Sequence, residues 1–360
     1  MKIIISTYGE NLEGGVLQYR EAISDLLSDT SMNIVSHDFA DLSKLVSSRL
    51  GQICKITFLI TLGYLNLFPW LFKSKLNRLS FDYNNCVVYV PNLALFPHCY
   101  FNFKYCLNMH DLQDHYYPRY FTLKERISRK LLRTIVRHNG GIIHCESDAV
   151  RLDVIKFLGI RREHSFVLPV PCKYKLEGKS VPNHPDGELI TLFYPASFWP
   201  HKNHERLLNA CRLVSNKGKR LKVVMTGGKN STDLMRLASN FDQDFEIDVI
   251  GEVSENVLIS HYRRAALVIV PSLFESISIP IEEALSFQCK VVASNVCGMV
   301  TQLDGRHLFD PYDTRSIASV ICVALDSDLS EWNQYRNQRA HSRAMFKENF
   351  KNAILSYYDN

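Results

Sequence analysis

The chain has 360 residues, of which 46% are hydrophobic and 22% are charged. This composition excludes a disordered chain, and the length favours two globular domains of ordinary size. None of the ten cysteines forms a Cys-x-x-Cys pair, so neither zinc-type spacing nor a disulfide framework is indicated. Free thiols in a reducing compartment are the expectation, and the predicted location is the cytoplasm, extending to the inner face of the cell membrane.

The net charge of +5 is unevenly distributed along the chain. Residues 1–180 carry 23 Lys and Arg against 16 Asp and Glu. A basic first half predicts an anionic partner, either a membrane surface or a phosphorylated lipid, although an ordinary solvated surface explains the charge equally well. Nucleic acid is not expected, because no aromatic stacking platforms are interleaved with the basic residues.

Strand and helix patterns alternate along the first half of the chain. Strands are predicted at residues 3–6, 86–90, 104–109, 141–145 and 165–170, and helices at 16–27, 123–138 and 149–158. The polar stretch 172–188, with its two prolines, is predicted to be a linker.

The second half repeats the alternation. Strands are predicted at residues 189–194, 221–226, 248–250, 267–270 and 290–293, with a long last helix at 331–358. The predicted fold class is therefore α/β, with two Rossmann-like domains facing across a cleft. We expect a first domain at 1–171, the linker at 172–188, a second domain at 189–345, and a final helical segment at 346–360.

Residues 56–72 form an almost uncharged, aromatic-rich stretch with basic residues on both sides. It is too short and too often interrupted by polar residues and Pro69 to predict a membrane-spanning helix. A segment lying at lipid headgroups and a buried part of the first domain remain equally good interpretations.

The strongest chemical signal is ESISIPIEE at residues 275–283, which follows a predicted strand and opens a predicted helix near Pro280. The start of a helix offers unpaired N–H groups and the positive end of its dipole, so it is a candidate diphosphate site. Glu275 and Glu283 would serve there as acceptors for sugar and ribose hydroxyl groups.

A second signal, FWPHKNH at residues 198–204, lies between a predicted strand and the next helix. Lys202 can meet a phosphate as a point charge. Asp242 and Asp244 form an Asp-x-Asp element, but they lie in an acidic loop and are interpreted as solvated surface rather than a metal site.

The two signals together resemble the retaining GT-B glycosyltransferases of family 4, the group 1 transferases. The resemblance extends from about residue 203 to 325, and more weakly over the first half. It implies that the first domain (1–171) binds the acceptor, that the second (189–345) binds the nucleotide-sugar, and that the final helix (346–360) crosses back to the first domain. It also implies that Glu275 contacts the donor sugar, that Glu283 holds the ribose, and that Lys202 neutralises the leaving diphosphate. Ser276 and Ser278 stand where relatives often have glycine, and Ala196 stands where many have arginine.

The resemblance implies further donor contacts and a cleft histidine. His110 matches the family's His-Asp element, and Asp111 follows it. The implied donor-binding residues are Glu283, Ser278, Ile279, Gly14, Gly15, Gly227, Gly251 and Val253. No cofactor is expected, because the nucleotide-sugar is a substrate. No metal is expected either, because Lys202 and the helix N-terminus would supply the positive charge at the diphosphate.

Basic residues recur along the predicted helix 123–138 at spacings that place them on one face. These are Arg126, Arg129, Lys130, Arg133 and Arg137. A stripe of this kind predicts contact with an anionic membrane or with the acceptor, most directly through the first four. A solvated face with ion pairs is an equally good interpretation.

We therefore expect a metal-independent, retaining glycosyltransferase of polysaccharide biosynthesis with a lipid-linked or oligosaccharide acceptor. The stretch 198–203 resembles mannosyl- and rhamnosyltransferases of bacterial surface polysaccharide assembly, of which O-antigen is an example. Two alternatives stay open: a nucleotide-sugar epimerase on the same fold, and a catalytically inert subunit that binds the donor.

Overall fold

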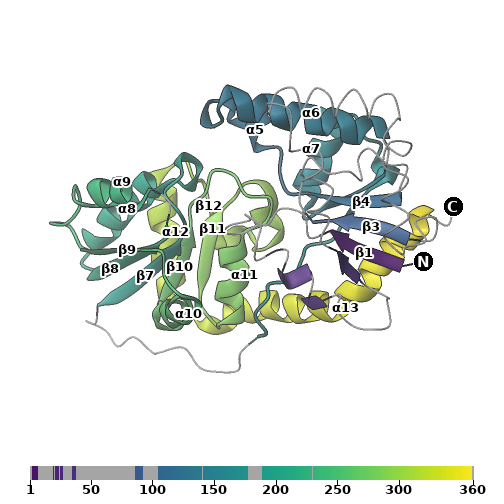
Figure 1. The fold of residues 1–360 in the computed structure, drawn as a ribbon. Helices are drawn as coiled ribbons and strands as arrows, with labels where there is room; N and C mark the ends of the chain where they lie inside the picture. Colours follow the sequence, from purple (N-terminus) through teal and green to yellow (C-terminus); the bar gives the residue numbers. More distant parts are fainter. Residues whose placement is uncertain are drawn as a thin grey trace. The chain divides into compact units, whose positions relative to one another are not determined.

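The computed structural model describes residues 2–6, 19, 21–23, 25–26, 35–37, 86–91, 104–139, 141–176, 189–228 and 230–358. The chain divides into two compact units (Figure 1). The first unit comprises residues 1–173 together with 345–360, and the second comprises residues 174–344.

The first unit is built on a parallel sheet whose described strands follow the order β2-β1-β3-β4-β5-β6. The strands are β1 (Lys2–Ser6), β2 (Val35–His37), β3 (Cys86–Val90), β4 (Lys104–Met109), β5 (Ile142–Cys145) and β6 (Ser165–Val167). Its described helices include α5 (Gln113–Tyr116), α6 (Leu123–Asn139) and α7 (Asp148–Leu158). The strand predicted at 165–170 thus ends three residues early.

The second unit holds a parallel sheet whose described strands follow the order β12-β11-β10-β7-β8-β9. The strands are β7 (Ile190–Pro195), β8 (Leu221–Thr226), β9 (Glu246–Gly251), β10 (Leu267–Val270), β11 (Val291–Ser294) and β12 (Leu308–Phe309). The helices are α8 (His204–Ser215), α9 (Ser231–Ala238), α10 (Glu255–Arg264), α11 (Ile279–Ser286) and α12 (Thr314–Asp326). Two parallel sheets of this kind confirm the predicted α/β class.

Central strands are buried on both faces, which is why they are continuous apolar runs rather than alternating patterns. All residues of β10 (LVIV) and β11 (VVAS) are buried. Helices end where the local sequence requires it: α7 has Ser147 as its N-cap, and it stops at Gly159, which takes the left-handed conformation with φ 64°.

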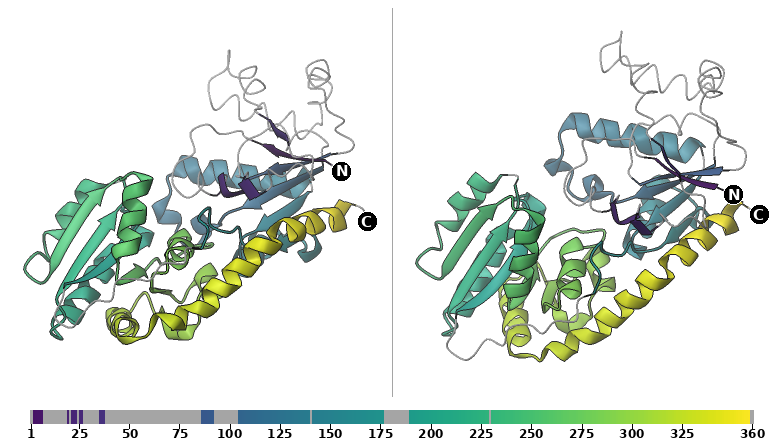
Figure 2. Two further views of the ribbon diagram at one scale, coloured as in Figure 1. Left: turned by 90° about the horizontal axis from the view of Figure 1, so that it is seen from below. Right: turned by 60° about the horizontal axis from the view of Figure 1, so that its bottom comes forward.

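The last helix, α13 (Asn333–Tyr358), belongs to both units (Figure 2). Its C-terminal part runs beside the sheet of the first unit, where Phe346, Phe350 and Ile354 are buried with residues of β3, β4 and β5. Tyr358 donates a hydrogen bond to the carbonyl of Tyr105 in β4, at 2.6 Å. The core of the first unit is therefore completed by residues from the far end of the chain.

Among the residues described, no helix is both long enough and apolar enough to cross a membrane. The aromatic-rich stretch 56–72 lies outside the described residues.

Candidate functional site

In the second unit, β7 and β10 are neighbours, although β8 and β9 lie between them in the sequence. The chain runs outward to one edge from β7 and to the other edge from β10. Ligands bind parallel α/β sheets at this switch point, beyond the carboxyl ends of the strands. The loops that follow β7 and β10 contain Lys202 and Glu275 respectively.

Lys202 and Glu275, 73 positions apart, meet at this edge. Lys202 Nζ lies 2.5 Å from Glu275 Oε1. The two side chains are 20% and 16% exposed, so both remain accessible from solvent. The cation and the carboxylate predicted from separate motifs therefore form one charged pair.

Backbone contacts hold the two loops together. His201 accepts a hydrogen bond from Leu273 N at 2.7 Å, and Tyr194 in β7 donates one to the carbonyl of Lys202 at 3.0 Å. Asn203 takes the left-handed conformation with φ 61°, and its side-chain amide donates to the carbonyl of Pro271 at 3.0 Å. These contacts fix Lys202 at the end of a 3₁₀ turn formed by Pro200–Lys202.

α11 begins immediately beyond Glu275. Ser278 is its N-cap residue, Ile279 is its first residue, and Pro280 lies in its first turn. Gln302 accepts a hydrogen bond from Ser278 N and donates one to the Ser278 carbonyl. The Ser278 hydroxyl is fully buried and has no hydrogen-bond partner among the described residues. A hydroxyl donor is therefore left over at the helix start.

Glu283 lies one turn into α11 and is 3% exposed. Tyr262 of α10 donates a hydrogen bond to Glu283 Oε2 at 2.6 Å. The adjacent Glu282 serves a different purpose, because it pairs with Arg339 of α13 and with Gln302. Tyr262, Gln302 and Arg339 were not singled out by the sequence reasoning, since nothing local marks residues that act through a distant partner.

The predicted glycines lie at the ends of β8 and β9. Gly227 N donates to the Gly251 carbonyl at 2.7 Å. Gly227 has φ 146°, and a Cβ there would meet Ser197 N at 2.5 Å, so only glycine fits against this loop. Gly251 has φ 67° with open space around it, and Val253 is half-buried two residues later. The backbone of the β7 loop is thus packed directly on the end of β8.

In the first unit, His110 follows β4 and contacts Asn108 of β4 and Glu146, the residue immediately after β5. His110 Nδ1 lies 2.6 Å from Glu146 Oε1, and the Asn108 amide donates to the same carboxylate oxygen at 3.2 Å. Burial lowers the pKa of His110, but the hydrogen bond and charge of Glu146, with the charge of Asp111, outweigh it and leave the pKa raised above 6.5. His110 is therefore held in place by a hydrogen bond with a buried carboxylate.

A second histidine lies behind this group. His144, in β5, is fully buried, accepts from or donates to the Tyr89 hydroxyl at 2.9 Å, and contacts the Leu168 carbonyl at 2.6 Å. Burial lowers its pKa to about 4. The Tyr19 ring packs edge-on against His110 at 4.8 Å and so links the two groups. Nothing local in the sequence marks these supporting residues, because they come from three separate strands, a helix and the residue after β5 and meet only in the folded chain.

The basic stripe is not uniformly exposed. Arg133 is 4% exposed and pairs with Asp114 of α5, and Arg129 is partly buried beside Asp111 at 3.2 Å. Arg126, Lys130 and Arg137 are exposed. Of the four residues predicted for membrane or acceptor contact, only Arg126 and Lys130 present their charge freely to a surface.

Gly14 and Gly15 lie outside the described residues. Asp244 of the Asp-x-Asp element pairs with Arg212 at 2.7 Å, and Asp242 is exposed. Within the described ranges, no group of three or more His, Cys, Asp or Glu is placed to hold a metal ion.

Comparisons with known proteins fit this geometry. Residues 177–344 match the family model "Glycosyl transferases group 1". The "O-antigen chain mannosyltransferase B" of Escherichia coli is 27% identical over 189 residues, a match that covers 51% of this chain and 46% of the relative. The matched region is therefore less than half the length of that relative.

Solved structures resemble the chain along nearly its whole length. A "Glycosyltransferase from Rickettsia africae ESF-5" has a TM-score of 0.66 at 14% identity, covering 100% of this chain and 99% of the other. A trehalose-6-phosphate structure from E. coli, "bound with UDP-2-fluoro glucose", has a TM-score of 0.66 at 13% identity, covering 98% and 99%. These likenesses confirm the GT-B fold class, and the match of residues 177–344 to the group 1 glycosyl transferase model confirms the resemblance for that part of the chain.

Proposed function

We propose that the protein is a metal-independent, retaining glycosyltransferase that moves a sugar from a nucleotide-sugar to a lipid-linked or oligosaccharide acceptor. The observation that carries the proposal is the Lys202–Glu275 pair at the carboxyl ends of β7 and β10, beside the start of α11. A cation, a helix N-terminus and a carboxylate on one edge suit a ligand with both phosphates and hydroxyl groups.

The proposed chemistry is electrostatic. Lys202 and the N–H groups at the start of α11 would stabilise the charge that develops on the departing diphosphate, and donors of this kind contribute about 10²–10³ each in rate. Glu275 would orient the donor sugar through its hydroxyls, and the leaving phosphate would take the acceptor proton. Glu283 would hold the ribose, with Tyr262 fixing its carboxylate.

The other proposed contacts follow the same loops. Ser278 and Ile279 would meet the diphosphate, and Gly227, Gly251 and Val253 would border the nucleotide. In the first unit, His110 would line the acceptor side, oriented by Glu146. Mannose or rhamnose is the proposed sugar, and the name of the E. coli relative supports mannose. Its O-antigen assignment likewise supports a surface-polysaccharide role, in the cytoplasm at the inner face of the membrane.

A thermal-shift panel tests this proposal. GDP, UDP, dTDP, ADP and their common sugars are added to the whole chain, with and without EDTA. A ligand at 100 times its Kd stabilises the native state by about 2.7 kcal/mol, which raises the melting temperature measurably. We expect one base to raise it, with EDTA making no difference. If no nucleotide shifts the melt, the donor site does not exist as proposed.

Two alternatives are separated by the next step. A nucleotide-sugar epimerase would convert the stabilising donor when no acceptor is present. An inert donor-binding subunit would bind the donor and release no nucleoside diphosphate with any acceptor. The transferase proposal requires release that depends on the acceptor.

A further inference from the structure

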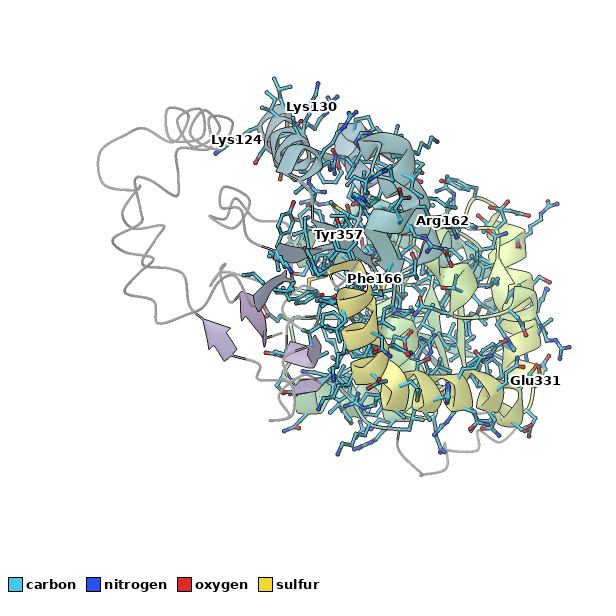
Figure 3. All side chains as sticks on the ribbon, turned by 90° about the vertical axis from the view of Figure 1, so that its right-hand side faces the viewer. Lys124, Lys130, Arg162, Phe166, Glu331 and Tyr357 are labelled. Carbon is cyan, nitrogen blue, oxygen red and sulfur yellow. The ribbon has the colours of Figure 1, made fainter. Side chains whose placement is uncertain are left out.

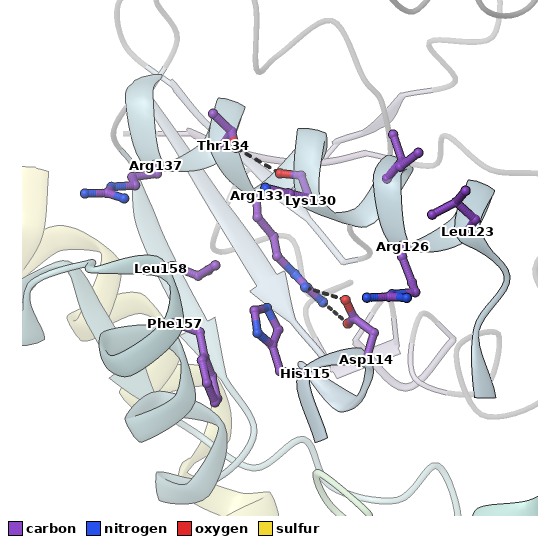
Figure 4. A pocket seen from close by; sticks show the side chains of 11 residues that line it. Asp114, His115, Leu123, Arg126, Lys130, Arg133, Thr134, Arg137, Phe157 and Leu158 are labelled. Atoms are coloured by element: carbon purple, nitrogen blue, oxygen red, sulfur yellow. Dashed lines mark hydrogen bonds and ion pairs between the residues drawn. The ribbon is translucent and has the colours of Figure 1, made fainter. Parts of the chain in front are cut away.

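The first unit contains a pocket of about 450 Å³ between α5, α6 and α7 (Figure 4). Four basic side chains of α6 line it, namely Arg126, Lys130, Arg133 and Arg137. They recur at positions three and four apart, so the helix presents them on one face. Asp114 is the acidic side chain among the lining residues.

That one acid is already neutralised. Both terminal nitrogens of Arg133 bind the Asp114 carboxylate, and Arg129 lies 3.5 Å from it. Arg126, Lys130 and Arg137 have no ion pair with any described acid. The pocket therefore carries an excess of positive charge that the described part of the chain does not balance.

Arg133 supplies a second observation. Arg133 lines the pocket, its side chain is 4% exposed, and its buried Nε–H has no hydrogen-bond partner among the described residues. A buried donor left unsatisfied costs about 1–3 kcal/mol, so such groups commonly await a ligand or a water. In Figure 4, Arg126 and Arg133 both extend toward Asp114, with His115 beside them.

Apart from Thr134, the rest of the wall consists of aromatic rings and aliphatic side chains. His115 stacks on Phe157 with ring centroids 4.4 Å apart. Leu123 and Ile127 line the pocket and are 69% and 50% exposed. Cations with a buried N–H donor match the oxygens of a phosphate group, and the exposed aliphatic residues match a hydrocarbon chain attached to it.

We propose that this pocket binds a phosphate group, with Arg126 and Lys130 supplying the charge and Arg133 holding the inner oxygen. If the proposed function holds, this phosphate belongs to the acceptor; only that assignment rests on the proposed function. The shared chemistry admits two sources, a lipid phosphate or a soluble phosphate ester, and the experiment separates them.

The probe is inorganic pyrophosphate, titrated calorimetrically into the whole chain after the nucleotide found in the thermal panel has saturated the site around Lys202. The test variant is Arg126→Gln with Lys130→Gln. The matched control is Lys124→Gln with Arg162→Gln, which removes the same charge from exposed positions of the first unit outside the pocket (Figure 3). We expect the test variant to bind pyrophosphate at least about tenfold more weakly and the control to bind like wild type.

Vesicles distinguish the sources. Phosphatidylcholine vesicles with and without phosphatidylglycerol are added as competitors. Competition by the anionic vesicles alone assigns a lipid phosphate, and no competition assigns a soluble one; both support the pocket. Unchanged affinity in the test variant, or equal loss in the control, overturns it.

Failure here is distinguishable from failure of the proposed function, because nucleotide stabilisation of the melt is read separately on the same variants. Charge removal at Arg126 and Lys130 leaves the Arg133–Asp114 pair intact, so the test variant is expected to fold. Arg133→Gln, which leaves Asp114 buried beside a neutral side chain, serves only as a second measurement on material shown to be folded.

Discussion

The two units hold their polar residues in different ways. In the second unit, Lys202 and Glu275 lie on loops, 20% and 16% exposed, and the loops are tied by backbone hydrogen bonds. In the first unit, His110 rests on Glu146, which is 4% exposed, and on Asn108, which is fully buried. We expect the partly exposed loop residues of the second unit to tolerate substitution with little effect on folding, whereas the buried polar residues of the first unit are part of its core.

The largest expected effect tests the loop site of the second unit. Lys202→Ala removes the proposed counter-charge of the diphosphate, and turnover should fall about 10²–10³-fold. Glu275→Ala should cut turnover at least about a hundredfold with little change in the melting temperature, because a partly exposed Lys202 can be hydrated. Steady-state kinetics with the donor identified by thermal shift provide the measurement.

Asp242→Ala is the matched control for these two variants. It removes an exposed acid of the same unit that lies outside the strand-end loops, and turnover should be unchanged. Near-wild-type turnover in Glu275→Ala would remove the residue from the proposed mechanism, and a low melting temperature would show that the loop is structural.

A change of about 3 kcal/mol in the free energy of unfolding with pH is expected from His144 in the buried core of the first unit. The pKa of His144 is lowered to about 4, so the unfolded chain takes up a proton at higher pH than the folded one. The folded state therefore loses stability as pH falls from 6.5 toward 4. Hydrogen–deuterium exchange of β4 and β5 peptides should report this loss, and His144→Gln should remove that part of the pH dependence.

His110 provides the opposite sign within the same unit. The pKa of His110 is raised in the folded state. Its contribution to folding stability is therefore complete below pH 6.5 and is lost as pH rises through the pKa of the folded state. Glu146→Gln should flatten the profile of stability against pH above 6.5. The part below 6.5, which is due to His144, should remain. If both variants changed the same limb, the separation of the two histidines would be wrong.

The smallest effect concerns the backbone beneath the β7 loop. Gly227→Ala combines a φ of 146° with a Cβ 2.5 Å from Ser197 N, and should destabilise by more than about 1 kcal/mol and weaken nucleotide binding. Gly218→Ala has φ 88° but nothing within 4 Å, so it measures backbone strain alone. Equal losses of nucleotide binding in the two variants would contradict a special role for Gly227.

Much of the fold could be predicted from the sequence because its central strands are short, mostly apolar runs. The strands at 86–90, 104–109, 221–226 and 267–270 have the predicted bounds. The strand β2 was not predicted, since three residues give too little periodicity. The domain bounds and the roles of the site residues stay predictions, although the structure brings Lys202 and Glu275 together.

Supporting residues were harder to predict than the residues that they support. Asn108 and His144 are register partners on β4 and β5, and only that pairing places them around His110 and Tyr89. The burial of Arg133 likewise depends on Asp114 from another helix. Helical spacing alone indicates that basic residues share one face, but it does not predict which of them form ion pairs with acidic residues of other helices.

The shared helix α13 has a consequence for how the chain is made. Phe346, Phe350 and Ile354 complete the core of the first unit, yet residues 174–344 are synthesised before them. At about 5–20 residues per second, the ribosome needs roughly 10–30 s to cross that interval. During this time the apolar face that α13 will cover, which includes Tyr89 and Cys106, remains uncovered by that helix. The second unit, contiguous in sequence, can fold first, and the first unit matures last although its first 173 residues emerge earliest.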